Sequence, residues 1–337
     1  MASTSSTGIR RWRRLPSELL RRAAWAAVLA AVRASLWFSP RPAALMIRAV
    51  FRRTGAAIDR GLAGHAPGGI ERLADEPYGD GPDDVLDVYH RTGARGPAPT
   101  IVWVHGGAFV GGSKEELRHW FELLADEGYT VVAPRYSLAP ESTYPTPVRQ
   151  VVAVLGHVCA HAGRLRVDPE RLVLAGDSAG AQLAAQVATL VTSPVYAERI
   201  GIEPRIRPDQ LRGVVLCCGA YDPSLDDTPS LFVRAVLWAY SGARDLAGDA
   251  AFGLMEVPAH VTADFPSVFV TAGNADPLLP QTTALVERLD GLGVETDTLL
   301  FPPDTSPPLG HEYQFLLDTP AGREALSRIL AFLARRV

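Results

Sequence analysis

Lysine and asparagine are almost absent from this chain of 337 residues, in which Lys114 and Asn274 are the only examples. Because Ala275 and Asp276 follow Asn274, the chain has no Asn-x-Ser/Thr acceptor, which excludes N-glycosylation. Arginine carries the positive charge, yet acidic residues outnumber basic ones and the formal net charge is −4. We therefore expect no basic surface of the kind that binds nucleic acid, and no nucleic-acid partner.

Cysteine is also scarce, and the three that are present do not form a pattern. Cys217 and Cys218 are adjacent in an apolar run, and Cys159 stands alone. An odd number with this spacing indicates neither a disulfide framework nor a metal site. Buried free thiols are typical of a reducing compartment, so we predict a cytoplasmic protein.

No apolar run is long enough to cross a membrane. Residues 23–32 are apolar, but Arg33 ends the run well short of the roughly 20 residues that a membrane-spanning helix needs. A basic start and a short apolar core also suit a secretory signal, although no clear small-x-small cleavage site follows. Three interpretations stay open: helices packed over the core, which we favour, peripheral contact with a membrane surface, or a cleaved signal. The basic residues that precede the run are Arg10, Arg11, Arg13, Arg14, Arg21 and Arg22.

Apolar strand patterns alternate with helical patterns along most of the chain. Strands are predicted at residues 85–89, 101–104, 130–133, 172–175, 214–218, 267–272 and 296–301. Helices are predicted at residues 115–127, 146–162, 181–191, 281–292 and 321–336, the second of them with Thr146 as its N-cap. This alternation predicts an α/β fold with a mainly parallel sheet and helices on both faces.

Two regions break the alternation. Residues 1–69 form an N-terminal helical region that includes an amphipathic stretch at 43–53 and ends in a Gly/Pro-rich linker at 63–69. The second region, residues 222–264, is long and irregular and contains several aromatic side chains. We predict a catalytic domain at 70–337, with the N-terminal region and the 222–264 insertion as a helical lid over the carboxyl edge of the sheet.

The stretch Gly176-Asp177-Ser178-Ala179-Gly180 lies between a predicted strand and a predicted helix. In that context a G-x-S-x-G pattern indicates a nucleophile elbow, a sharp turn that exposes the serine hydroxyl at the edge of the sheet. Small flanking residues let the strand and the helix approach closely. We predict Ser178 as a nucleophile and a structural role for Asp177, whose side chain should point away from it.

A second Gly-rich loop, His105-Gly106-Gly107-Ala108-Phe109, follows the strand predicted at 101–104. Acyl transfer creates an oxyanion, which needs N–H donors held in place beforehand. We predict an oxyanion hole made by the N–H groups of Gly106, Gly107 and Ala179. His105 lies on this side and is expected to brace the loop rather than act as a base.

A serine nucleophile needs a base and an orienting carboxylate, which follow it in this fold in the order Ser, Asp or Glu, His. Asp276 follows the strand at 267–272, and His311 follows the strand at 296–301. Both therefore lie at the carboxyl edge in the required order, and we predict them as the remaining catalytic residues. A turn-forming Asp before Pro277 is the alternative for Asp276, and a solvated side chain is expected for Glu312. Surface or packing roles are expected for His119, His157 and His161.

Together these motifs resemble the hormone-sensitive-lipase-like group of α/β-hydrolases, which includes many bacterial carboxylesterases. The resemblance covers about residues 85–335 and differs in two places: Ala108 stands where a third glycine is common, and Leu279-Pro280-Gln281 where acidic residues are common. The matching pieces are His105-Gly106-Gly107, Tyr136-Ser-Leu-Ala-Pro-Glu141, Gly176-Asp-Ser-Ala-Gly180, Asp276-Pro-Leu278 and His311.

The function predicted is that of a serine hydrolase that cleaves small-molecule carboxylic esters, as lipolytic enzymes do, through an acyl-enzyme. No metal and no organic cofactor is expected, because the three catalytic residues supply the nucleophile, the base and the orienting carboxylate. Two alternatives are an amide or formamide hydrolase that uses the same residues, and a catalytically inactive binding protein. The natural ester and the oligomeric state do not follow from the sequence.

Overall fold

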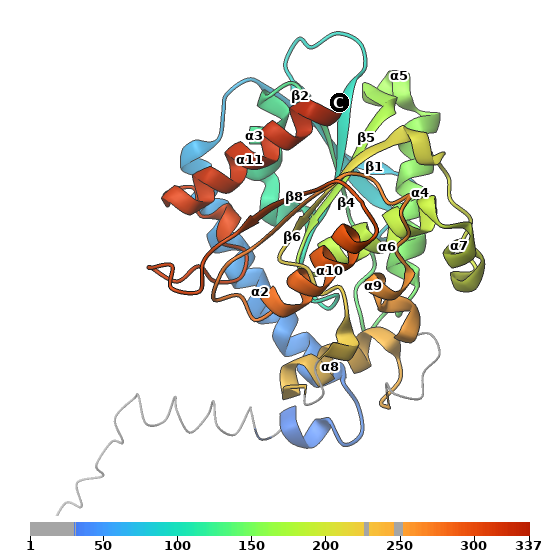
Figure 1. Ribbon diagram of the computed structural model, residues 1–337, viewed down its shortest axis with the longest axis vertical. Helices are drawn as coiled ribbons and strands as arrows, with labels where there is room; N and C mark the ends of the chain where they lie inside the picture. Colours follow the sequence, from blue (N-terminus) through green and yellow to red (C-terminus); the bar gives the residue numbers. More distant parts are fainter. Residues whose placement is uncertain (1–29, 31, 226–228, 246–251) are drawn as a thin grey trace, which may run out of the picture.

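A computed structural model describes residues 30, 32–225, 229–245 and 252–337 of the chain (Figure 1). The arginines at 10–22 and most of the apolar run at 23–32 lie outside the described residues, as do 226–228 and 246–251 within the predicted insertion. Among the described helices, none combines the length and the apolar character that crossing a bilayer requires.

An eight-stranded sheet in the order β1-β2-β4-β3-β5-β6-β7-β8 forms the centre of the molecule (Figure 1). β2 pairs antiparallel with β1 and β4, and the remaining pairs are parallel. The predicted mainly parallel sheet is therefore confirmed. Its strands are β1 Ile70–Pro77, β2 Val85–Arg91, β3 Ala98–Val104, β4 Thr130–Pro134, β5 Val167–Asp177, β6 Leu211–Cys217, β7 Val268–Ala272 and β8 Thr296–Leu300.

Helices cover both faces of the sheet, and successive strand residues contribute to different cores, as the pleat requires. Val102 and Leu174 belong to a core with residues of α4 and α6, whereas Trp103 and Val173 belong to a core with residues of α3 and α11. The helices are α2 Arg41–Leu62, α3 Arg118–Asp126, α4 Thr146–Ala160, α5 Ala162–Leu165, α6 Ala179–Thr192, α7 Pro194–Ile200, α8 Leu231–Ser241, α9 Val257–His260, α10 Leu279–Gly291 and α11 Pro320–Arg336.

Several elements differ from the sequence prediction. β1 was not predicted because, as an edge strand, it buries little of its surface and so lacks apolar alternation. The helix expected at 115–127 begins as a 3-10 turn, Lys114–Leu117, before α3. Thr146 starts α4 but does not cap it, since Pro145 is in the N-cap position and no side chain bonds there.

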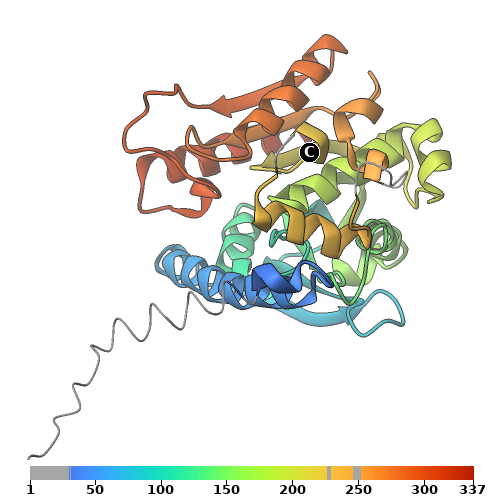
Figure 2. The same ribbon diagram turned by 90° about the horizontal axis from the view of Figure 1, so that it is seen from below.

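The amphipathic stretch predicted at 43–53 and the region 222–264 both contain more helix than the sequence predicts. α2 continues to Leu62, beyond the amphipathic stretch at 43–53. Within 222–264, α8 begins after Ser230, whose hydroxyl accepts a hydrogen bond from the Val233 N–H as an N-cap does. α8 packs against α2, and Figure 2 shows the two helices side by side.

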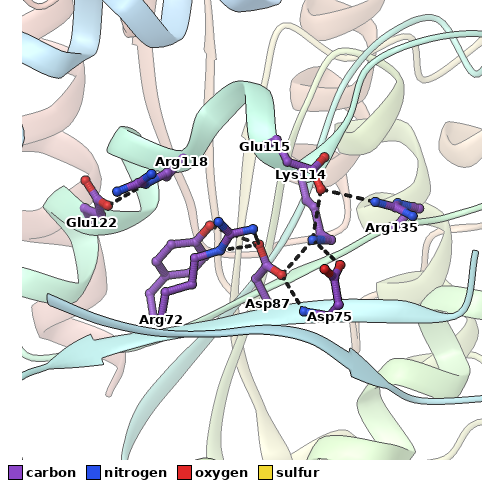
Figure 3. Close-up of polar contacts among 9 residues, drawn as sticks. Arg72, Asp75, Asp87, Lys114, Glu115, Arg118, Glu122 and Arg135 are labelled. Atoms are coloured by element: carbon purple, nitrogen blue, oxygen red, sulfur yellow. Dashed lines mark hydrogen bonds and ion pairs between the residues drawn. The ribbon is translucent and has the colours of Figure 1, made fainter.

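The only lysine of the chain lies at the buried centre of a cluster of charged side chains (Figure 3). Lys114 Nζ lies 2.6 Å from Asp87 Oδ1, 2.9 Å from Asp75 Oδ1 and 3.0 Å from Glu115 Oε1, and the Lys114 and Asp87 side chains are fully buried. Burial alone would lower the pKa of Lys114, but the hydrogen bonds to these carboxylates raise it above its ordinary value. The cluster therefore ties the chain that follows the Gly-rich loop to β1 and β2.

Replacing Lys114 with methionine is expected to lower the free energy of unfolding by about 3 kcal/mol, near the lower end for breaking a buried ion pair. The Asp87 carboxylate would stay buried without the lysine, although Arg72 still pairs with it at 2.7 Å. Urea unfolding measures the change. As a control, Arg207→Met removes exposed pairs with Glu170 and Asp209 and should change stability by less than about 1 kcal/mol. Equal small effects of both variants would contradict the prediction.

Candidate active site

Ser178 lies at the turn between β5 and α6. Its backbone angles, φ 52° and ψ −119°, fall in a region that residues other than glycine rarely adopt. The backbone around it is tightly packed. A Cβ added at Gly176 would meet the backbone of Gly180, and one added at Gly180 would meet the carbonyl of Val104. The two glycines thus permit the strained turn that the pattern predicted.

His311 lies between Ser178 and Asp276 and contacts both. Its Nε2 is 2.9 Å from Ser178 Oγ, and its Nδ1 is 3.0 Å from both Asp276 carboxylate oxygens. Asp276 also accepts a hydrogen bond from the Leu278 N–H at 2.8 Å. The structure therefore brings together the three residues predicted as nucleophile, base and orienting carboxylate, each from the end of a different strand.

Charge and burial have opposite effects on the pKa values of Asp276 and His311. Burial disfavours the carboxylate, but the hydrogen bond and charge of His311 and the Leu278 N–H hold the pKa of Asp276 below its usual value. Burial also disfavours a charged imidazole, yet the Asp276 hydrogen bond and the charges of Glu312 and Asp276 raise the pKa of His311 above 6.5. The surroundings of His311 therefore favour its protonated form over that of an ordinary histidine.

Cys218, Asp276 and His311 place potential metal-ligand atoms within 4.8 Å of one another. The geometry does not suit a metal, because Asp276 and His311 already bond each other. Burial also raises the pKa of the Cys218 thiol well above its usual value, whereas a thiolate is the form that binds metal. These residues fit a hydrogen-bonded catalytic group better than a metal centre.

The predicted oxyanion donors differ in what they contact. The Gly106 N–H donates to Asp177 Oδ2 at 2.8 Å, so in contrast to the expectation it faces a carboxylate rather than the cavity. Gly107 has φ 122°, and a Cβ there would meet the Gly111 backbone. Ala179 opens helix α6, where N–H groups lack partners within the helix. Gly107 and Ala179 are therefore the stronger candidates.

His105 and Asp177 hold the Gly-rich loop in place. His105 is only 2 % exposed to solvent. Burial lowers the pKa of its imidazole to about 4, so the ring is neutral. It stacks on Tyr136, whose hydroxyl donates to the His105 carbonyl at 3.0 Å. Asp177 accepts from Trp103 Nε1 at 2.8 Å as well as from the loop. Both residues lie where a bracing role requires them.

A cavity of about 260 Å³ opens beside Ser178 and His311. Phe51, Thr54, Gly55 and Ile58 of α2 line one side of it. Phe51 is in edge-to-face contact with Phe232 of α8 at a ring-centroid distance of 6.2 Å. The N-terminal region thus supplies part of the wall around Ser178.

Two other acidic residues line this cavity, and the sequence pointed to neither as part of a substrate pocket. Glu116 lies in a surface-like charged run, Lys114-Glu115-Glu116, that gives no signal of burial. Glu312 was expected to be solvated, but its side chain is only 23 % exposed and lies 3.9 Å from His311 Nε2. His119 and His157 do not line the cavity: His119 pairs with Glu122, and His157 with Glu76.

Comparison with known proteins identifies relatives of the same architecture. A family model described as alpha/beta hydrolase fold matches residues 101–304. An esterase of Gibberella moniliformis is 27 % identical over 207 residues, which are 60 % of this chain and 64 % of the relative. An acetyl esterase of Salmonella choleraesuis is 29 % identical over 202 residues, 56 % of this chain and 59 % of the relative. The chain thus spans less than two thirds of the length of these curated relatives.

Solved structures show the same fold over nearly the whole chain. Esterase B from Lactobacillus rhamnosis superposes with a TM-score of 0.73 at 24 % identity, covering 87 % of this chain and 97 % of that one. The esterase from Pyrobaculum calidifontis gives 0.68 at 22 % identity, covering 94 % and 96 %. At these identities the likeness supports the fold, and the predicted fold class is confirmed.

Proposed function

The chain belongs to the alpha/beta hydrolase family, and from that membership we propose that it hydrolyses small carboxylic esters through an acyl-enzyme on Ser178. The observation that carries the proposal is the unbroken hydrogen-bonded series Ser178, His311, Asp276 beside a cavity. Nucleophile, base and orienting carboxylate lie within hydrogen-bond reach, as acyl transfer requires. The names of the relatives, esterase and acetyl esterase, favour esters over amides.

In this mechanism Ser178 Oγ attacks the ester carbonyl carbon while His311 Nε2 accepts its proton. Asp276 keeps the His311 Nδ1 proton in place and stabilises the imidazolium. The N–H groups of Gly107 and Ala179 stabilise the negative oxygen, aided by the positive end of the α6 dipole. Collapse expels the alcohol, which takes the proton from His311. Water then attacks the acyl-enzyme by the same sequence and restores Ser178.

α2 and α8 form the proposed lid. α2 lines the cavity through Phe51 and Ile58, and α8 supports it through Phe232. The lid role, the domain boundary near residue 69 and peripheral contact with a membrane remain predictions. A cavity of about 260 Å³ suits a short acyl group.

Covalent labelling tests the proposal. A fluorophosphonate should modify the protein once, and mass spectrometry of the digest should place the adduct on the peptide that contains Ser178. p-Nitrophenyl acetate should be hydrolysed, with rates that fall as the acyl chain lengthens. A folded protein that neither reacts with the fluorophosphonate nor hydrolyses any p-nitrophenyl ester would overturn the proposal.

Activity is expected to fall on the acidic side through one ionisation, that of His311. Only neutral imidazole accepts the Ser178 proton, and the pKa of His311 is raised above 6.5, chiefly by the Asp276 hydrogen bond acting against burial. The protonated, inactive form therefore persists to higher pH than for an ordinary histidine. The profile of kcat/KM, followed at the isosbestic wavelength of p-nitrophenol, should have its acidic limb above pH 6.5. A plateau that continues down to pH 5 would contradict this.

A further inference from the structure

The cavity beside Ser178 has an acidic wall formed by Glu116 and Glu312. The Glu116 carboxyl packs over Gly55 of α2, where any side chain would overlap it. Glu312 has φ 60° and follows His311 directly, so its carboxylate lies near both the imidazole and Gly106. Two elements distant in sequence, the turn Lys114–Leu117 and the loop after β8, therefore present carboxyl groups to the same space.

Neither carboxylate has a cationic partner among Lys and Arg side chains in the described part of the chain. Two other glutamates with little exposed surface pair with an arginine, Glu76 with Arg164 and Glu122 with Arg118. Among the residues that the structure describes, the one ion pair of Glu312 is with His311, which is charged only when protonated. The wall lacks its counter-charge.

The pKa of Glu116 reflects the burial of its carboxyl group without a cationic partner. Burial, with the charges of Glu115 and Glu312, raises the pKa of Glu116 to about 7, while the charge of Arg52 of α2 lowers this pKa and that of Asp59 of α2 raises it. Burial and the charge of Glu312 also raise the pKa of Asp177 well above its usual value, although Asp177 accepts hydrogen bonds from Trp103 and Gly106. A cation in the cavity would relieve the carboxylates of Glu116 and Glu312.

We propose that this wall selects esters whose alcohol portion carries a cationic amine, protonated or quaternary. The inference rests on the proposed esterase function and deepens it. The leaving oxygen must approach His311 Nε2 to receive its proton, and Glu312 Oε1 lies 3.9 Å from that atom. A cation a few atoms along the alcohol chain therefore reaches the carboxylates, whose attraction is stronger in a partly enclosed cavity than in water. An anionic alcohol portion meets repulsion at the same wall.

A matched pair of substrates tests the inference: acetylcholine and its uncharged isostere 3,3-dimethylbutyl acetate. At pH 8.5, where Glu116 is ionised, the wild-type ratio of kcat/KM for the cationic over the neutral ester should exceed about 10, mainly through KM, since that is the discrimination a close charge pair supplies. Glu116→Gln and Glu312→Gln should each lower the ratio about fivefold, and added salt should lower it too. The ratio cancels any general loss of activity in a variant.

Glu287→Gln on α10 is the matched control, because it removes the same charge from an exposed site outside the cavity. The ratio of kcat/KM for the cationic over the neutral ester should stay within twofold of the wild-type value in this variant. A ratio near one in the wild type, or a ratio that neither cavity variant changes, overturns the inference. If the enzyme hydrolyses the neutral ester but shows either of these outcomes, the esterase proposal still stands. Failure to hydrolyse any ester would defeat the esterase proposal itself.

A second measurement needs no variant. Choline should inhibit p-nitrophenyl acetate hydrolysis competitively, with an inhibition constant about tenfold lower than that of 3,3-dimethylbutanol, because the two alcohols share a shape and differ in charge. Equal inhibition by the two alcohols would contradict a role for the acidic wall even if the variants fail to fold.

Discussion

Ser178→Ala is expected to lower kcat for ester hydrolysis by roughly 10³- to 10⁶-fold, because residues of a catalytic triad act as a unit. Alanine keeps the backbone of the elbow but removes the Oγ that lies 2.9 Å from His311 Nε2. Without it no acyl-enzyme forms, and the residual rate reflects binding and the oxyanion donors alone. Steady-state hydrolysis of p-nitrophenyl acetate measures the loss, and circular dichroism with urea unfolding shows whether the variant is folded.

Ser267→Ala provides the control for the serine substitution. Ser267 lies at the opposite end of β7 from the site, and its hydroxyl bonds only Glu295 in the described structure, at 3.1 Å. This variant should keep the activity and the fluorophosphonate labelling of the wild type. Turnover by Ser178→Ala at the wild-type rate would remove Ser178 from the mechanism.

Asp276→Asn is expected to reduce kcat by about 10⁴-fold, the order of loss that replacing the orienting carboxylate of a Ser-His-Asp triad by an amide causes. An amide offers an N–H where the carboxylate offers an acceptor, so the His311 Nδ1 proton loses its partner and the other tautomer is favoured. That tautomer carries its proton on Nε2, which can then no longer accept the proton of Ser178. Hydrolysis at high enzyme concentration measures the residual rate.

The same variant should also move the pH profile. The Asp276 hydrogen bond and charge raise the pKa of His311, whereas burial lowers it, so removing the carboxylate charge moves the acidic limb of kcat/KM to lower pH. A variant that merely disturbed packing would lose rate without this shift. Asp209→Asn, at an exposed surface position, should change neither quantity. Near-normal activity of Asp276→Asn would direct the search for the orienting carboxylate to Glu312.

Part of the fold could be predicted because its signals are local. The buried parallel strands appear in the sequence as continuous apolar runs, and the long helix α11 buries residues at helical spacing. β1 and α8 gave weaker signals for opposite reasons. β1 is exposed on most of its residues, and α8 is apolar over most of its length, so neither shows the alternation or the amphipathic pattern that identifies such elements.

The sequence by itself determined which residues reach the carboxyl edge of the sheet. Ser178, Asp276 and His311 each follow a strand, and in a parallel sheet the ends of successive strands meet at one edge whatever the details of packing. Chain order and glycine placement are properties of the local sequence. For that reason the set could be predicted before any distance between its members was known.

Only the tertiary structure decided where the other charges lie. Gly106 donates its N–H to Asp177, Lys114 is buried against Asp87, and Glu116 lines the same cavity as Ser178. Each of these outcomes depends on contacts between residues far apart in the chain. The residue type alone does not show whether a charged side chain is solvated or buried. Burial and partner choice set the pKa and the free energy of such a group, so the three-dimensional arrangement decides its chemistry.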